Sequence, residues 1–396
     1  MSLNIIKEKI QQAIEILNEK NIDMWLTFVR ETKVSKDPII DMIVGDHLTW
    51  QSAFIINKDG DTASLVGSIE EENIKKLALY GQVTGYIQSI REPLLNYLEL
   101  KKPRTIAINY SKNSVLADGL THGMYLILCE YLKNTSFPKE VISSEEIISA
   151  LRGRKSKTEL AIMKEAIAET LKIFDEVTSF ITPGKSEIEV ANFVLEKVKE
   201  RNLQTAWDSA TCPAVFTGPN PSSAHSGPTD RIIEKGHIVS MDFGIKYKGY
   251  CSDLQRCWYV LKDNETQAPE PVQKGFEVIR DAIQKVADAI KPGVMGVEMD
   301  DIARNYIVQS GYPEYPHGLG HQVGREVHDG GAGLFPRWER YGQTPFMRLE
   351  AGQVFTIEPR LPVDGYGVVT IEEEVLITEN GCEFLSTPQK ELILIS

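Results

Sequence analysis

The sequence has few cysteines, and their arrangement argues against two kinds of site. Its 396 residues include five: Cys129, Cys212, Cys251, Cys257 and Cys382. The number is odd and no pair has the Cys-x-x-Cys spacing, which argues against a disulfide scaffold and against a cysteine-type zinc site. Free thiols in this pattern predict a reducing, cytoplasmic location.

Long apolar runs and an excess of positive charge are also missing. No apolar stretch approaches the roughly 20 residues that span a bilayer, and the amphipathic first ten residues lack the apolar core of a signal peptide. The net charge of −13 argues against nucleic acid or an anionic membrane surface as a partner. With 42% hydrophobic and 25% charged residues, the composition is that of a globular protein, and the length favours two domains.

Residues 1–150 alternate between strand and helix patterns. Helical spacing of apolar residues covers about 3–20, 70–79 and 116–132. Strand patterns cover 24–28, 50–56, 63–66 and 105–109. This alternation predicts a small N-terminal α/β domain that ends near residue 150, and no catalytic motif is found in it.

Residues 151–396 contain an internal repeat. In each half a long amphipathic helix stops at Ile-x-Pro-Gly, at Ile181–Gly184 and again at Ile290–Gly293, and a second helix follows. Capping boxes at Ser156 and Ser186 mark the helix starts in the first half. Residues 155–260 and 265–380 therefore look like two copies of one unit, which predicts an α+β domain with a pseudo-twofold axis and a site on that axis.

Each copy ends in strands that carry carboxylates. Asp242 and Asp253 lie on a predicted hairpin in the first copy, and Glu358 and Glu372 each close a Thr-Ile-Glu tripeptide in the second. Buried acids are costly without a cation, and four of them would repel one another strongly. Two divalent ions would balance four carboxylates. Oxygen ligands favour manganese, magnesium or iron, although cobalt or zinc could also bind.

Three of the seven histidines lie within twelve residues, at His317, His321 and His328. The glycines between them would let the backbone approach a ligand closely. Three histidines beside a carboxylate cluster indicate a functional group of residues, with His321 as a neutral fifth ligand. Two adjacent metals activate a water for attack on a carbonyl group.

These motifs closely resemble those of the pita-bread metallopeptidases, which include Xaa-Pro aminopeptidase, prolidase and methionine aminopeptidase. The preceding domain resembles the N-terminal domain of the first two and of creatinase. The resemblance implies that Asp242 and Asp253 chelate one metal, that His321 binds the other, that Asp253 and Glu372 bridge both, and that Glu358 is also a ligand. It also implies a proton shuttle at Glu358, and contacts to the substrate from these residues: His225, His317 and His328.

The sequence departs from the family pattern at the substrate side. Prolidases often have an arginine two residues before the last glutamate, where this chain has Thr370. The usual glycine after Glu-Pro is replaced by Arg360, which could supply the missing charge and contact the substrate. His328 is followed by Asp-Gly-Gly instead of Glu-x-Pro, so the rim of the pocket also differs.

The leading hypothesis is an Xaa-Pro aminopeptidase that uses two divalent metal ions, most simply Mn²⁺, on proline-containing peptides. Prolidase activity is the alternative within the same chemistry. A creatinase-like hydrolase that cleaves a C–N bond without metal, and a non-enzymatic binding protein on the same fold, are the alternatives outside it. The resemblance further implies a homodimer, and no nucleic-acid or membrane partner is expected.

Overall fold

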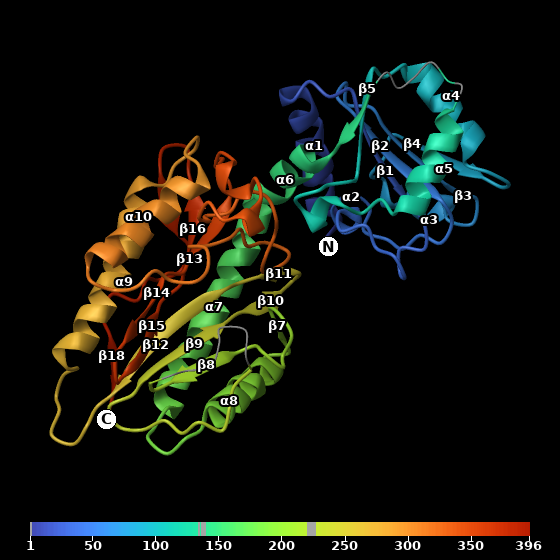
Figure 1. The fold of residues 1–396 in the computed structure, drawn as a ribbon. Helices are drawn as coiled ribbons and strands as arrows, with labels where there is room; N and C mark the ends of the chain where they lie inside the picture. The colour runs from blue at the N-terminus through green and yellow to red at the C-terminus, as the bar shows by residue number, and fades with distance from the viewer. Residues whose placement is uncertain (1, 134, 136–139, 220–226) are drawn as a thin grey trace. The chain divides into compact units, whose positions relative to one another are not determined.

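The computed structural model describes residues 2–133, 135, 140–219 and 227–396 (Figure 1). Contacts divide the chain into two compact units, Met1–Arg152 and Gly153–Ser396, which are described separately. Across the described ranges, no helix combines the length and the apolar character that crossing a membrane requires.

The first unit is a six-stranded mixed sheet in the order β4-β3-β2-β1-β5-β6. Helices α1, α2 and α6 pack on one face of the sheet, and α4 and α5 pack on the other. The bounds are β1 Met24–Val29, β2 Ser52–Asn57, β3 Thr62–Gly67, β4 Gln82–Tyr86, β5 Thr105–Ile108, β6 Glu140–Ser143, α1 Leu3–Glu19, α2 Ile40–Ile43, α3 Glu71–Leu77, α4 Arg91–Lys101, α5 His122–Leu132 and α6 Glu145–Gly153.

The predicted strands of this unit are all present, but one helix begins later than expected. A helix was predicted from about residue 116, whereas α5 begins at His122. Thr121 is its N-cap and accepts a hydrogen bond from the backbone of Met124. The residues before it form a short 3₁₀ turn, Val115–Ala117.

The second unit contains four long helices around several small sheets (Figure 1). The helices are α7 Lys157–Phe180, α8 Glu187–Glu200, α9 Glu270–Ala289 and α10 Gly296–Gln309. The strands are β7 Gln204–Thr205, β8 Ala214–Thr217, β9 Ile238–Phe243, β10 Ile245–Tyr247, β11 Tyr250–Cys251, β12 Leu254–Val260, β13 Val354–Ile357, β14 Arg360–Val363, β15 Gly367–Thr370, β16 Glu373–Ile377, β17 Cys382–Phe384 and β18 Ile393–Ile395. The sheets are ordered β18-β12-β9-β8, β11-β10-β7, β13-β16-β17 and β14-β15.

The internal repeat is visible in the backbone of the two Pro-Gly turns. Gly184, after α7, has φ +94° and donates its N–H to the carbonyl of Ile233 at 2.9 Å. Gly293, after α9, has φ +90° and makes the equivalent bond to Leu349 at 2.8 Å. Both positions need the left-handed conformation that glycine adopts without strain. The two turns are therefore the same structure used twice.

The helix starts after these turns also match. The side chain of Glu189 accepts from the backbone N–H of Ser186 at 2.8 Å, and that of Glu298 accepts from Met295 at 2.6 Å. Ser186 completes a capping box, as predicted, with its own hydroxyl. The unit of a long helix, a Pro-Gly turn and a second helix is thus present twice, as α7–α8 and α9–α10, in the order that the sequence predicted.

Packing of the helices decides which strand faces are available for a site. Alternate residues of β9 and β12, including Met241 and Leu254, pack in the same core as α7 and α8. Asp242, Asp253 and Gln255 therefore project from the opposite face, because side chains alternate along a strand. In the second half, Ile357 and Ile371 belong to the α9–α10 core. Glu358 and Glu372, the next residue after each, therefore point to the opposite face.

The polar faces of the two halves meet along β9, β12 and β15. The backbones of Gln255 and Glu372 form an isolated antiparallel bridge. Beside it, the hydroxyl of Ser240 donates to the carbonyl of Val368 at 2.8 Å. This junction brings residues from both copies to one interior location.

Candidate metal centre

A compact group of potential ligands lies at the junction. One side-chain ligand atom each from Asp253, His321 and Glu372 lies within 4.8 Å of the others. His321 Nε2 is 3.6 Å from Asp253 Oδ2 and 3.4 Å from Glu358 Oε1. Four of the five predicted ligands thus share one small volume.

Asp242, the fifth predicted ligand, joins this group through a shared hydrogen-bond donor. Nε2 of Gln255 lies 3.3 Å from Asp242 Oδ2 and 3.3 Å from Glu358 Oε2. Asp242 is also the largest single neighbouring charge that raises the pKa of Asp253. The structure therefore brings all five residues together, two from the first copy and three from the second.

Several carboxylate oxygens in the group are buried and lack a hydrogen-bond partner among the described residues. They are Asp242 Oδ1, Asp253 Oδ1 and both oxygens of Glu372. Buried acceptors normally have partners, and each unsatisfied one needs an explanation. A divalent cation would satisfy several of these oxygens at once.

The raised pKa values of the four carboxyl groups are those expected of a site that takes up cations. Burial raises the pKa of Asp242 to about 7. Burial, followed by the neighbouring carboxylates, raises the pKa values of Asp253, Glu358 and Glu372 well above their usual range. Positive charge among four such groups would restore their ionised forms. The donor set therefore fits divalent metal ions with oxygen preference.

His321 is held as a neutral ligand would be. Burial and the nearby His328 lower the pKa of its ring to about 3, so the ring is uncharged at neutral pH. Nδ1 lies 3.3 Å from the carbonyl of Gln322, which leaves Nε2 toward the carboxylates. Thr356 fixes the backbone on both sides, because its hydroxyl accepts from the N–H of His321 at 3.0 Å and its own N–H donates back at 2.9 Å.

The glycines around His321 allow close packing of the backbone against protein, while their predicted role in the approach to a ligand stays a prediction. A Cβ at Gly320 would lie 2.0 Å from the carbonyl oxygen of Thr356, and one at Gly318 would lie 2.2 Å from the ring of Phe335. These glycines allow the histidine segment to pack against protein, which places His321 against β13.

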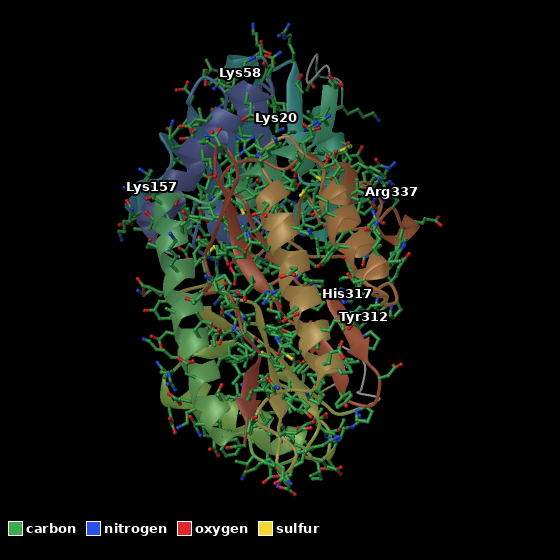
Figure 2. All side chains as sticks on the ribbon, turned by 90° about the vertical axis from the view of Figure 1, so that its left-hand side faces the viewer. Lys20, Lys58, Lys157, Tyr312, His317 and Arg337 are labelled. Atoms are coloured by element: carbon green, nitrogen blue, oxygen red, sulfur yellow. The ribbon has the colours of Figure 1, made fainter. Side chains whose placement is uncertain are left out.

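The other predicted histidines lie in different environments. Figure 2 labels His317 on the segment after α10, where its carbonyl accepts from Arg304 at 2.8 Å and its Nδ1 lies 2.7 Å from the carbonyl of Gly318. His328 is exposed, and its ring packs edge-on against that of His321 with centroids 4.3 Å apart. His225 lies outside the described residues.

Glu374 and Arg256 support the cluster but were not predicted from the sequence. Oε1 of Glu374 accepts from the backbone N–H of Asp253 at 2.8 Å. Arg256 donates from Nη1 to the carbonyls of both Gln255 and Glu372, at 2.8 and 3.1 Å. It also pairs with buried Glu373 at 3.1 Å. Period-two alternation from Glu372 and Asp253 could have drawn attention to Glu374 and Gln255.

Arg360 lies directly opposite Thr370 on the paired strands β14 and β15. Its guanidinium is half-buried and lies 5.9 Å from the ring of Phe216. Burial lowers the pKa of Arg360, whereas the charges of Glu358 and Asp242 raise it. This chain has Thr370 where prolidases often have an arginine, and Arg360 carries a positive charge on the paired strand instead. The charge of Arg360 interacts with those of Glu358 and Asp242.

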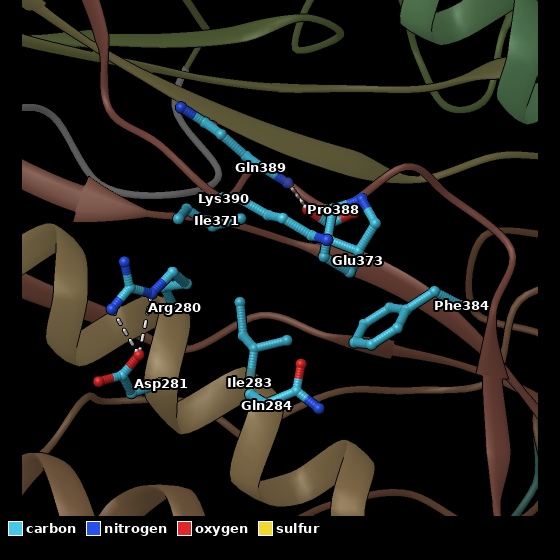
Figure 3. A pocket seen from close by; sticks show the side chains of 10 residues that line it. All are labelled: Arg280, Asp281, Ile283, Gln284, Ile371, Glu373, Phe384, Pro388, Gln389 and Lys390. Carbon is cyan, nitrogen blue, oxygen red and sulfur yellow. Dashed lines mark hydrogen bonds and ion pairs between the residues drawn. The ribbon is translucent and has the colours of Figure 1, made fainter.

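A separate cavity of about 460 Å³ lies behind the extended segment that carries Glu372, between β15 and β16. Figure 3 shows Ile371 and Glu373, the neighbours of Glu372, lining it together with Ile283 of α9 and Phe384. Successive side chains in an extended segment point to opposite faces, so the Glu372 carboxylate lies on the other side. The cavity is therefore distinct from the carboxylate cluster.

Comparison with known families identifies the fold and its chemistry. The sequence profile of Metallopeptidase family M24 matches residues 161–379, more than half of the chain and all five clustered residues. The chain belongs to this family. The prediction of a pita-bread metallopeptidase is confirmed, together with the α+β class of the fold.

Individual relatives match from 70% to 99% of the chain. An Xaa-Pro dipeptidase of Pyrococcus horikoshii is 29% identical over 99% of this chain and 100% of its own length. The uncharacterized peptidase YqhT of Bacillus subtilis is 34% identical over 70% of this chain and 73% of its own. The solved structure of an Xaa-Pro dipeptidase from Bacillus anthracis is 26% identical, has a TM-score of 0.73 and covers 98% of this chain and 100% of that one.

Proposed function

We propose that the protein is a dinuclear metallo-exopeptidase that cleaves the Xaa-Pro bond at the N-terminus of peptides. The observation that carries this proposal is the convergence of four carboxylates and one histidine from both repeats, with several carboxylate oxygens left without a partner among the described residues. Family membership supplies the class of reaction, hydrolysis of a peptide bond.

In this proposal the ligands are divided between two ions. Asp242 and Asp253 would hold one ion and His321 the other, Asp253 and Glu372 would contribute to both, and Glu358 would be a further ligand. We propose Mn²⁺ as the ion, with Co²⁺ or Zn²⁺ as alternatives, because the donor set is rich in oxygen. When bound, such ions supply Lewis-acid polarisation and an activated water.

The remaining steps depend on side chains of this chain. Glu358 takes up the proton that the nucleophilic water releases and passes it to the leaving amine. His317 and His328 donate hydrogen bonds to the scissile peptide as negative charge develops on its oxygen. We assign the same kind of role to His225. Arg360 is proposed to contact the carboxylate of a short substrate.

Proline specificity rests on the relatives. Two of the proteins that match this chain over almost its whole length are named Xaa-Pro dipeptidases. We propose aminopeptidase activity first, because Thr370 replaces the arginine that would favour dipeptides. The position of Arg360, opposite Thr370 on the paired strand, supports Xaa-Pro dipeptidase activity as the second candidate.

We extend the proposal to the domains of the chain, its location and its oligomeric state. We assign residues 151–396 to a dinuclear pita-bread domain and residues 1–150 to a creatinase-like N-terminal α/β domain. We also propose a cytoplasmic homodimer. The thiols of five cysteines without disulfides, all in the described part of the chain, support the location.

A peptide panel tests the activity directly. We expect Mn²⁺-dependent release of the first residue from Ala-Pro-Ala and from longer Ala-Pro peptides, with little release from Ala-Ala-Ala, as measured by mass spectrometry. Cleavage that is independent of added metal and survives chelation would favour the creatinase-like alternative. Metal binding without turnover of any Xaa-Pro peptide would favour a binding protein and would contradict the proposed activity.

Arg360→Met tests the substrate contact and separates the two specificities. If Arg360 binds a substrate carboxylate, the variant should raise KM for Ala-Pro by about tenfold to a hundredfold, since a hydrogen bond to a charged group contributes roughly 1.5–3 kcal/mol. KM for a long Ala-Pro peptide, whose carboxylate is distant, should change little. Equal KM changes for both substrates would argue against this contact. Arg348→Met, which removes an exposed arginine, is the matched control.

A further inference from the structure

Gln255 lies where the carboxylates of the two halves meet. Only 6% of the residue is exposed. Its amide nitrogen lies 3.3 Å from oxygens of both Asp242 and Glu358, and its amide oxygen accepts from the hydroxyl of Thr370. A primary amide has two N–H donors, so each carboxylate receives one of them. The side chain therefore links three segments through one rigid planar group.

The backbone of Gln255 is equally constrained. Its N–H and carbonyl exchange hydrogen bonds with Glu372 at 3.4 and 3.3 Å. Arg256 donates to the carbonyls of both residues. Gln255 therefore cannot move without displacing the strand segment that carries Glu372, and its amide is presented from a fixed point.

The Gln255 amide bonds to only one of the two oxygens of Asp242 and of Glu358. In Glu358, Oε2 faces Gln255, whereas Oε1 faces His321 at 3.4 Å. In Asp242, Oδ2 faces Gln255, whereas Oδ1 is buried with no partner among the described residues. One oxygen of each acid is thus fixed by the amide while the other is left for the cluster.

We propose that Gln255 is a positioning residue that sets the affinity of the metal centre by fixing both Asp242 and Glu358. This inference rests on the ligand set proposed above. Two buried carboxylates repel each other and would rotate apart if no donor lay between them. Partners that hold ligating groups from behind commonly contribute 10- to 100-fold, in rough terms, to metal affinity.

Thr370 determines which way the amide points. Its hydroxyl donates to Oε1 of Gln255, and this leaves the NH₂ group directed at the carboxylates. The equivalent Thr356, in the other Thr-Ile-Glu tripeptide, accepts a bond from the backbone of His321 instead. Thr356 therefore fixes the backbone of His321 directly, whereas Thr370 orients the amide that holds Asp242 and Glu358.

Metal affinity measured by calorimetry tests this proposal. The full-length chain, stripped with a chelator and dialysed, is titrated with Mn²⁺, and bound metal is counted by mass spectrometry. Gln255→Met, which keeps the shape but removes the amide, should weaken Mn²⁺ binding by about 10- to 100-fold. Thr370→Val should weaken it by a smaller factor, and Thr370→Ser, which keeps the hydroxyl, should retain wild-type affinity.

Cys257→Ala is the matched control, because Cys257 lies on the same face of β12, is fully buried, and has its backbone held by Gln389. It should bind Mn²⁺ like the wild type. Wild-type affinity in Gln255→Met would overturn the inference while leaving the proposed function intact. If that variant does not fold, equal affinities in Thr370→Val and Thr370→Ser would overturn it. A wild-type chain that binds no Mn²⁺ would refute the proposed metal centre and this inference with it.

Discussion

Replacement of Glu358 by glutamine is expected to reduce kcat/KM for an Xaa-Pro peptide by about 10²–10⁴-fold, the range that a positioned acid–base group contributes. Glu358 Oε1 lies 3.4 Å from His321, and burial followed by the charge of Asp242 raises the pKa of the carboxyl well above its usual range. Glutamine keeps the shape and can still offer one oxygen to a cation, but it cannot accept and return a proton.

This measurement must separate proton transfer from loss of metal. It is therefore made at Mn²⁺ concentrations that saturate the variant, with bound metal counted on the same sample. Glu379→Gln removes an exposed carboxylate by the same chemical change and should leave kcat/KM unchanged. A metal-loaded Glu358→Gln enzyme within twofold of the wild type would exclude the assigned role.

Glu372→Gln is expected to stabilise the metal-free protein and to remove the stabilisation that metal provides. Glu372 is 1% exposed, and neither of its carboxylate oxygens has a partner among the described residues. Without ions, a buried acid beside Asp253 and Glu358 opposes folding, because burial and the neighbouring carboxylates raise its pKa and disfavour its ionised form. A neutral amide at this position should therefore raise the melting temperature of the metal-free protein. With ions, the wild type should gain about 2.7 kcal/mol for each ion present at 100 times its Kd.

The sign of the mutational effect should therefore reverse when metal is added. Differential scanning calorimetry of both proteins, with chelator and with Mn²⁺, measures this directly. Glu379→Gln should follow the wild type in both conditions. If Glu372→Gln lowers the melting temperature with chelator and Mn²⁺ raises it as much as in the wild type, then Glu372 neither repels its neighbours nor binds the ions.

The repeat and the carboxylate cluster could be predicted because they rest on local rules. Pro-Gly stops, capping boxes and strand alternation are encoded within a few residues, and they placed Asp242, Asp253, Glu358 and Glu372 on inward faces. Convergence could also be inferred, since four buried acids need a common solution. His321 could be included because two more histidines lie within twelve residues of it, but its approach to the cluster depends on the close packing of Gly320 against β13, which the sequence does not show.

The supporting residues could not be predicted in the same way. Strand alternation places Gln255 on the inward face, but Gln255 bonds to Glu358 and Arg256 bonds to Glu372, each more than a hundred positions away, and a single sequence gives no local sign of these partners. In the first unit, α4 was missed because its N-cap position is Ile90, whose side chain makes no capping bond, and Pro93 follows near its start. Its register is fixed by the sheet on which it packs, not by its own sequence signals.

The bridge between Gln255 and Glu372 has a consequence for the order of events during biosynthesis. The side-chain bond from Thr370 to Gln255 joins residues 115 positions apart. A nascent chain that has produced Asp242 and Asp253 cannot complete the group of five proposed ligands until the segment with Glu358 and Glu372 has left the ribosome. Contacts of such long range form late, after loop closure has been achieved. We therefore expect ion capture to be post-translational and to lock a domain that is already largely folded.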